Sequence, residues 1–143
     1  MKIGELARAA QCTVDTVRYY EREGLLPEPT RSDSNYRQYG HAHVERLRFI
    51  RNCRALDMAH EEIRALLQYS DQAGSDCRGV NALVDEHIAH VDVRIQELER
   101  LKGDLIALRA RCAHDSDVSS CGIIQELSHR ETDGKPPKHT HLG

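Results

Sequence analysis

The chain has 143 residues, of which 39% are hydrophobic, 30% charged and only 4% aromatic, which favours one small domain with long exposed helices over a large single core. No apolar run approaches the roughly 18 residues of a membrane span, and the first residues lack the apolar segment of a secretory signal, so we expect a cytoplasmic protein without membrane contact. In that compartment the five cysteines are more consistent with thiols or metal ligands than with disulfides.

Charged and aromatic residues are distributed unevenly along the chain. Residues 1–56 hold ten Lys and Arg against seven Asp and Glu, whereas the remainder holds ten against sixteen. Five of the six aromatic residues also lie in the first part. The net charge of -3 thus conceals a basic, aromatic head, which favours a nucleic-acid partner, and an acidic, aliphatic body.

The N-terminus predicts two short helices. Apolar residues at helical spacing predict a helix over residues 3–10. Thr13 is a good N-cap for a second helix, which should end at Gly24. Two short helices joined by a brief turn are typical of a helix-turn-helix.

Residues 25–40 differ in character from the flanking segments. The turn-forming Asp33-Ser34-Asn35 precedes the alternating, β-prone Tyr36-Arg37-Gln38-Tyr39. This pattern predicts a small hairpin, or wing. Apolar spacing then predicts helices over about 41–56, with Leu56 among its apolar residues, and about 59–69.

A long helix is predicted over residues 80–111. Its apolar residues repeat at spacings of three and four, as Val84, Ile88, Val91, Ile95, Leu98, Leu101, Leu105 and Leu108. So narrow a stripe on so long a helix requires a partner helix. Since the sequence predicts no second long helix, we expect a homodimer. After this helix we expect a short polar loop, one helical turn near 122–127 and a mobile tail.

Three cysteines flank the predicted long helix. Cys77 precedes it, and Cys112 and Cys121 follow it. Cys77 and Cys112 are 35 positions apart, or about 50 Å along a helix, so they cannot share a site within one chain. Two antiparallel copies bring Cys77 of one chain to Cys112 of the other, and the midpoint of this pair falls near the middle of the apolar stripe. Cys12 and Cys53 occupy core-like positions, and we expect a structural role for them.

Three thiolates predict a site for a soft metal ion, such as Cd(II), Pb(II), Hg(II), Zn(II) or Cu(I). A divalent ion leaves one negative charge uncompensated and a monovalent ion leaves two, so a partly desolvated site favours the divalent ion. Three thiolates suit Pb(II) and Hg(II), whereas Cd(II) and Zn(II) usually take a fourth ligand.

A second, harder metal site is a further hypothesis. His87 and His90 lie three residues apart on the long helix, so one face presents both imidazoles. Glu86 is adjacent, and Glu61 or Glu62 on the preceding helix could approach, with Glu62 taken as the third ligand. His139 and His141 in the tail add further candidates. The opposing interpretation is a set of polar surface histidines. The remaining histidines show no grouping, and we expect them on the surface.

The chain resembles the MerR family of metal-responsive transcriptional regulators over nearly all of its length. The segments that carry the resemblance are Ile3-Gly4-Glu5-Leu6-Ala7, Thr16-Val17-Arg18-Tyr19-Tyr20-Glu21, Gly24-Leu25-Leu26, Asn35-Tyr36-Arg37-Gln38-Tyr39 and Leu47-Arg48-Phe49-Ile50-Arg51 through Leu56-Asp57-Met58. Cys77 separates the chain from the monovalent-copper sensors of that family, which have Ser there. The segments 80–88 and 121–125 look most like those of the cadmium- and lead-responsive members.

The resemblance implies a mechanism and partners. A dimer of such a regulator sits on an operator between two promoter elements whose spacer is longer than RNA polymerase prefers. Metal binding then bends and untwists the DNA and brings the elements into register, at an energy cost that depends on DNA deformability. The effector ion implied is Cd(II) or Pb(II), with Zn(II) and Hg(II) as alternatives.

The resemblance also implies DNA contacts. The second helix should enter the major groove of double-stranded promoter DNA, with the wing on the backbone. The candidate contact residues are Thr13, Thr16, Arg18, Tyr19, Tyr36 and Arg37.

We therefore expect an all-α fold with a small β wing: a winged helix-turn-helix head followed by a long antiparallel coiled-coil dimerisation helix. The expected divisions are a DNA-binding domain at 1–70, a linker with Cys77 at 71–79, a dimerisation helix at 80–111, a metal-binding loop and short helix at 112–127, and a flexible His-containing tail at 128–143.

Two other classes of regulator or binder remain as alternatives. A redox sensor on the same scaffold would use its cysteines for an iron–sulfur cluster or a disulfide. A cluster would need four closely spaced cysteines after the long helix, and this sequence has only Cys112 and Cys121 there. A cytosolic thiol metal buffer would bind metal without DNA, which the helix-turn-helix and wing argue against. We expect no enzyme, because the sequence has no nucleophile elbow, phosphate loop or His-Glu-x-x-His motif.

Overall fold

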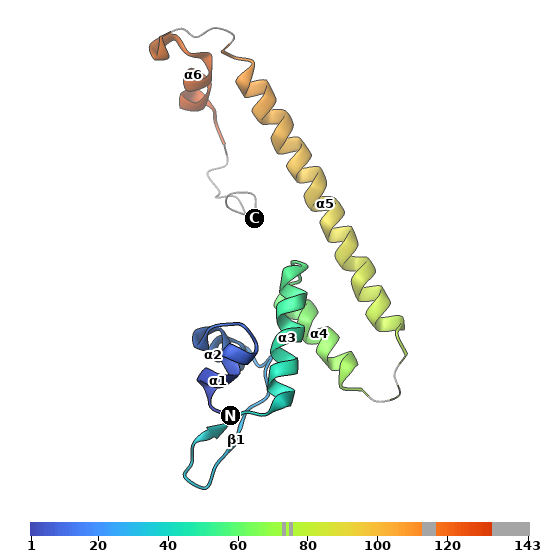
Figure 1. Cartoon of the computed structure of the whole chain (residues 1–143). Helices are drawn as coiled ribbons and strands as arrows, with labels where there is room; N and C mark the ends of the chain where they lie inside the picture. The colour runs from blue at the N-terminus through green and yellow to red at the C-terminus, as the bar shows by residue number, and fades with distance from the viewer. Residues whose placement is uncertain (73, 75, 113–116, 133–143) are drawn as a thin grey trace. The chain divides into compact units, whose positions relative to one another are not determined.

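The computed structural model describes residues 1–143 except 73, 75, 113–116 and 133–143. The elements follow in chain order (Figure 1) as α1 (Ile3–Ala9), α2 (Val14–Arg22), β1 (Thr30–Arg31), β2 (Arg37–Gln38), α3 (His41–Ala55), α4 (His60–Ser70), α5 (Arg78–Arg109), the 3-10 helix η1 (Val118–Ser120) and α6 (Gly122–His129). They form two compact units, Met1–Asp85, which we call the head, and Glu86–Gly143. The expected fold class, helical with a small two-stranded sheet, is confirmed for the described residues.

The helix-turn-helix forms for local reasons. The connection between α1 and α2 turns at Gln11, whose φ is 57°. Thr13 then caps α2, since its hydroxyl accepts a hydrogen bond from the Thr16 N–H at 3.1 Å. The chain leaves α2 at Gly24, whose φ of 73° suits glycine.

The wing is an antiparallel pair of two-residue strands. Thr30 pairs with Gln38 and Arg31 with Arg37. The turn between them is closed by the Ser32 N–H, which donates to the Tyr36 carbonyl at 2.7 Å. Asn35 adopts a φ of 64°, which asparagine tolerates better than most residues.

The head has one hydrophobic core, to which α1, α2, α3 and α4 all contribute. Its largest fully buried side chains are Leu6, Val17, Leu25, Leu47, Ile50 and Ile63. Burying a side chain of this size contributes about 1.5–3 kcal/mol. The prediction that Leu56 belongs to the apolar face of α3 was wrong, because Leu56 is 65% exposed, whereas Cys53 is buried as expected. The helix ends at Ala55, and the chain then turns through Asp57, whose φ is 60°.

The second unit contains most of α5 and the short helix α6. No described residue of α5 is buried within the chain. Helix α6 has eight residues rather than the single turn predicted. His139 and His141 lie outside the described residues. Within the described part of the chain, no helix combines the length and the apolar character that a bilayer crossing requires.

Candidate functional site

The start of α2 holds two of the predicted DNA-contacting residues in a cap. The hydroxyls of Thr13 and Thr16 share a hydrogen bond of 2.8 Å in addition to the backbone cap. Arg18, one turn further along α2, is exposed. This arrangement fixes the first turn of α2 and leaves a cationic side chain on its surface.

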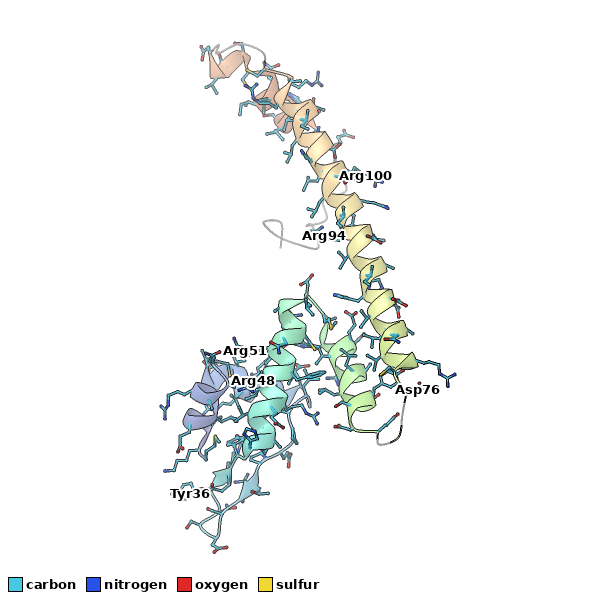
Figure 2. The ribbon with its side chains drawn as sticks, turned by 45° about the vertical axis from the view of Figure 1, so that its right-hand side comes forward. Tyr36, Arg48, Arg51, Asp76, Arg94 and Arg100 are labelled. Atoms are coloured by element: carbon cyan, nitrogen blue, oxygen red, sulfur yellow. The ribbon has the colours of Figure 1, made fainter. Side chains whose placement is uncertain are left out.

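An arginine from α3 braces the turn of the helix-turn-helix. Figure 2 shows Arg48 and Arg51 on α3. The Arg51 guanidinium donates to the Ala10 carbonyl at 2.8 Å and to the Gln11 side-chain oxygen at 3.5 Å. Arg51 is 41 positions from Ala10, which is why the sequence pattern did not single it out.

Glu21 ties the wing to α2. Its carboxylate accepts a hydrogen bond from Arg37 at 3.0 Å, and its other oxygen accepts one from the Tyr39 hydroxyl. The Glu21 side chain is only 14% exposed and that of Arg37 is 49% exposed. Burial, and after it the hydrogen bond to Glu21, raises the pKa of Tyr39. Tyr36, which lies on the wing (Figure 2) and precedes Arg37 in the chain, is 67% exposed.

A cavity of about 410 Å³ gathers three of the predicted DNA-contacting residues, Arg18, Tyr36 and Arg37. Its remaining lining residues are Lys2, Ile3 and Tyr39. Lys2 was not predicted, although its basic side chain at the start of α1 was a visible signal. The cavity thus combines three cations with two tyrosines, a composition suited to a phosphate backbone.

Tyr19, another predicted contact residue, lies against a histidine of α4. Its ring centroid is 5.4 Å from that of His60, and its hydroxyl is 3.4 Å from the His60 Nδ1. His60 also makes an edge contact with Tyr20 at 5.9 Å. His60, which was expected on the surface, is half-buried and contacts both tyrosines. Tyr19 and His60 are 41 positions apart, and no local pattern indicates their contact.

Two of the five cysteines belong to the core of the head. Cys53 is buried, and Cys12 packs against the core. Burial raises the pKa of both thiols, although Arg51 partly opposes this effect at Cys12. Both sites disfavour the thiolate that a metal needs.

Cys112 and Cys121 come together where α5 ends and α6 begins. Cys121 is the N-cap residue of α6. The backbone N–H of Ile124, then that of Ile123, the Cys112 side chain and the charge of Arg109 lower the pKa of the Cys121 thiol. Cys112 lies beside Arg109, which donates to its carbonyl at 2.7 Å. The pair offers two soft sulfur donors, which fit a thiophilic ion.

The third predicted thiol ligand, Cys77, belongs to the head and immediately precedes α5. It is exposed, and its carbonyl accepts a hydrogen bond from the Asn81 N–H at 2.8 Å in the first turn of the helix. The continuous 32-residue helix α5 runs between Cys77 and Cys112.

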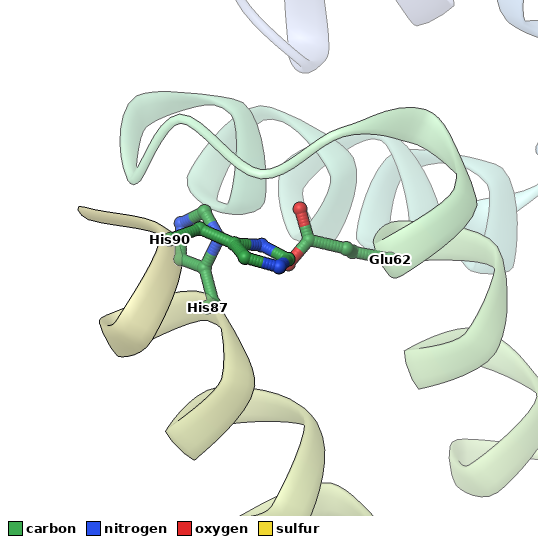
Figure 3. Close-up of side chains that lie close together, drawn as sticks. All are labelled: Glu62, His87 and His90. Atoms are coloured by element: carbon green, nitrogen blue, oxygen red, sulfur yellow. The ribbon is translucent and has the colours of Figure 1, made fainter. Parts of the chain in front are cut away.

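The candidate residues of the second metal site come from α4 and α5. Figure 3 shows His87 and His90, which lie in the N-terminal half of α5, and their ring centroids are 6.5 Å apart. The His90 Nε2 lies 3.9 Å from a carboxylate oxygen of Glu86. Glu62 belongs to the head, where its carboxylate accepts a hydrogen bond from the Ala59 N–H at the start of α4. The three-residue site stays a prediction.

The predicted apolar stripe of α5 is open to solvent in the single chain. Its exposed members are Val84, Ile88, Val91, Ile95, Leu101 and Leu105. Leu98 and Leu108 are half-buried. Such a row of exposed aliphatic side chains is expected on a helix that packs against a partner.

Comparisons with known proteins agree with this arrangement. Residues 1–70 match the model of the MerR HTH family regulatory proteins, and residues 44–108 match the model described as MerR, DNA binding. The chain is 44% identical over 117 residues to the HTH-type transcriptional regulator ZntR homolog of Haemophilus influenzae, covering 82% of this chain and 87% of that protein. It is 36% identical over 126 residues to the mercuric resistance operon regulatory protein of Bacillus cereus, covering 88% of this chain and 96% of that protein.

A solved structure extends the likeness to the fold. The crystal structure of the transcription regulator PbrR691 from Ralstonia metallidurans CH34 in complex with lead(II) matches with a TM-score of 0.82 and 50% identity. The match covers 89% of this chain and 98% of that one. The resemblance predicted from the sequence motifs is confirmed, and the chain belongs to the MerR family of helix-turn-helix regulatory proteins.

Proposed function

We propose that the chain is a transcriptional regulator that responds to a soft divalent heavy-metal ion, Cd(II) or Pb(II) in the first place and Zn(II) or Hg(II) as alternatives. The observation that carries this proposal is the meeting of Cys112 and Cys121 beyond the end of α5, together with the exposed thiol of Cys77 before its start. The lead(II) complex of the Ralstonia relative supports a soft-metal effector.

The proposed active species is an antiparallel homodimer formed through residues 80–111. The exposed stripe of α5 supports it, because burying these side chains against a second copy removes apolar area from water. At 1.5 Å per residue the 32-residue helix is about 48 Å long. An antiparallel partner of the same length brings Cys77 of the partner subunit to Cys112 and Cys121.

The proposed metal site combines these three thiolates. Their negative charges are best balanced by a divalent ion, and sulfur favours thiophilic metals. Two of the donors come from one chain and one from the other, so an ion in the site links the subunits and holds the residues after α5 in place. Glu62, His87 and His90 stay the candidates for a second, harder site.

The head is proposed to bind double-stranded promoter DNA in the cytoplasm. Helix α2 enters the major groove through Thr13, Thr16, Arg18 and Tyr19, and the wing contacts the backbone through Tyr36 and Arg37. The cavity that joins Arg18 to the wing supports this assignment. The dimer holds the promoter in both states, and metal favours the state that distorts the DNA for RNA polymerase. The metal can act only through a difference in its affinity for those states.

This proposal is tested by transcription in vitro from a promoter that the protein binds. The reaction is titrated with each ion under buffered thiol, using wild-type protein and a Cys112→Ser variant. The proposal predicts activation by a soft divalent ion and none with the variant, while both proteins bind the promoter without metal. Activation that survives in the variant would contradict Cys112 as a metal ligand, and a protein that binds metal but no DNA would instead favour a thiol metal buffer.

A further inference from the structure

Gly122, the first residue of α6, lies directly against the backbone beyond the end of α5. A β-carbon at this position would collide with the Arg111 carbonyl oxygen and lie 3.1 Å from its carbonyl carbon. Backbone atoms cannot swing aside as the end of a side chain can. The absence of a side chain at Gly122 therefore permits the close approach of α6.

Other glycines in the described residues do not have this constraint. Gly4, Gly24, Gly40, Gly74 and Gly103 have no neighbouring atom within 4 Å of a built β-carbon. At Gly79 the β-carbon would meet only ring atoms of Tyr69, a side chain that can move. Gly122 is thus distinguished by its contact with backbone atoms.

The contact flanks the two cysteines that follow α5. Arg111 directly precedes Cys112, and Gly122 directly follows Cys121. The packing of Gly122 against the Arg111 backbone therefore sets how closely the sulfur atoms of Cys112 and Cys121 can approach. A second interaction reinforces this packing, because the Arg111 guanidinium donates a hydrogen bond to the Glu126 carboxylate at 2.8 Å. Gly122 and Glu126 are four residues apart, so they share a face of α6.

We propose that Gly122 is a positioning residue for the metal-binding thiolates. It lets α6 pack against the Arg111 backbone, and this packing holds the Cys121 sulfur beside that of Cys112. The inference rests on the proposed function for the identity of the ligand, but the approach of the two sulfurs does not depend on metal. Sites that bind metals tightly need their ligands fixed within a fraction of an ångström, and loss of supporting contacts costs about 10- to 100-fold in affinity.

The first test compares Gly122→Ala with Gly103→Ala in the full-length protein. Gly103 is exposed on α5, and it lies two residues from both Leu101 and Leu105, so it faces away from the apolar stripe. Pb(II) binding is followed by the lead–thiolate absorption band in competition with a chelator. We expect Gly122→Ala to bind Pb(II) about 10-fold more weakly than wild type, with a shifted absorption band, and Gly103→Ala to match wild type.

The second test measures the approach of the sulfurs without metal. The apo protein is equilibrated with reduced and oxidised glutathione, and peptide mapping gives the fraction with a Cys112–Cys121 disulfide. Each disulfide formed oxidises two thiols, with loss of their two protons, and reduces one glutathione disulfide to two glutathione molecules. We expect Gly122→Ala to need a more oxidising buffer than Gly103→Ala to reach the same fraction.

The two readouts separate this inference from the proposed function. If wild type binds no Pb(II) but Gly122→Ala impairs the disulfide equilibrium, the proposed metal response fails and the positioning role stands. If Gly122→Ala equals Gly103→Ala in both measurements, the positioning role is overturned. Should Gly122→Ala unfold, Glu126→Gln takes its place, because it removes the ion pair on the same face of α6. A few-fold loss of Pb(II) affinity and of disulfide formation in Glu126→Gln supports the positioning role of the α6 packing, and no loss in either measurement overturns it.

Discussion

The Glu21 carboxylate of α2 and the Arg37 guanidinium of β2 form an ion pair of 3.0 Å across 16 positions of sequence. Glu21 is mostly covered and Arg37 is half exposed. The pair thus fixes the wing against the proposed recognition helix while one face of Arg37 stays open to a DNA phosphate.

Glu21→Gln should weaken operator binding about two- to fivefold, the effect of a partly exposed ion pair. Glutamine keeps the shape of the side chain but carries no charge, so the ion pair with Arg37 is lost and the wing is held less firmly. Fluorescence anisotropy with promoter DNA measures the change. Glu5→Gln on α1 is the control, since it adds the same unit of charge. Binding by Glu21→Gln as tight as by Glu5→Gln would show that the pair does not position the wing.

Thr13→Ala should destabilise the protein by about 1 kcal/mol, because the cap of α2 loses its hydroxyl acceptor. The hydrogen bonds from the Thr16 N–H at 3.1 Å and with the Thr16 hydroxyl at 2.8 Å define this cap. Denaturant unfolding without DNA measures the free energy of unfolding and separates capping from DNA contact. Thr13→Ser, which keeps the hydroxyl, should remain near wild type. Equal stability of Thr13→Ala and wild type would contradict a capping role.

The Tyr39 phenol should titrate late, because burial and the Glu21 carboxylate raise its pKa. A phenol with a raised pKa holds its proton longer in the folded than in the unfolded chain. Its stabilising contribution is complete below a pH of about 10 and is lost as the pH rises through the raised pKa. Phenolate absorbance during alkaline titration measures this.

In that titration Tyr39→Phe should remove absorbance from the late part of the curve, and Glu21→Gln should move the same absorbance to lower pH. Tyr20 also has a pKa raised mainly by burial, so some late absorbance should persist in both variants. If Tyr39→Phe instead removed phenolate absorbance from the low-pH part of the titration, the predicted environment of Tyr39 would be contradicted.

The helices could be predicted from the sequence because their signals are local. The Thr13 cap, the Gly24 stop and the spacing of apolar residues along α5 each act within a few positions. The end of α3 was less predictable. Leu56 continues the apolar pattern, but the turn at Asp57 ends the helix first and leaves Leu56 exposed.

Contacts that define the site in the head could not be predicted, because they join distant positions. Arg51 reaches the Ala10 carbonyl, and Tyr19 meets His60, in each case across 41 positions. The three cysteines proposed as metal ligands were predicted from their spacing around one helix. The close approach of Gly122 to Arg111, which sets the geometry of two of them, depends on backbone packing that spacing does not encode.

Replacement of both Ile95 and Leu98 with Asp should convert the proposed dimer into monomers. The two positions lie on the stripe near the middle of α5, where charged side chains would be buried without partners. Analytical ultracentrifugation gives the mass. Val93→Asp is the matched control, because Val93 is 53% exposed on the same helix and lies two residues from Val91 and Ile95, hence facing away from the stripe. A dimer in both variants would remove the geometric basis of the shared metal site.

The central claim is that Cys77 of one subunit ligates the same ion as Cys112 and Cys121 of the other. It is tested most directly by mixing a Cys77→Ser chain with a Cys112→Ser/Cys121→Ser chain. In the heterodimer the first chain supplies Cys112 and Cys121 and the second supplies Cys77, so one site is intact and the other has lost all three thiolates. Bound metal per dimer is measured on the purified species with Pb(II). The wild type should bind two ions and the heterodimer about one, whereas each mutant homodimer should bind far more weakly, because a missing thiolate removes both charge and a strong bond. A heterodimer that binds no better than its parent homodimers would contradict the shared site.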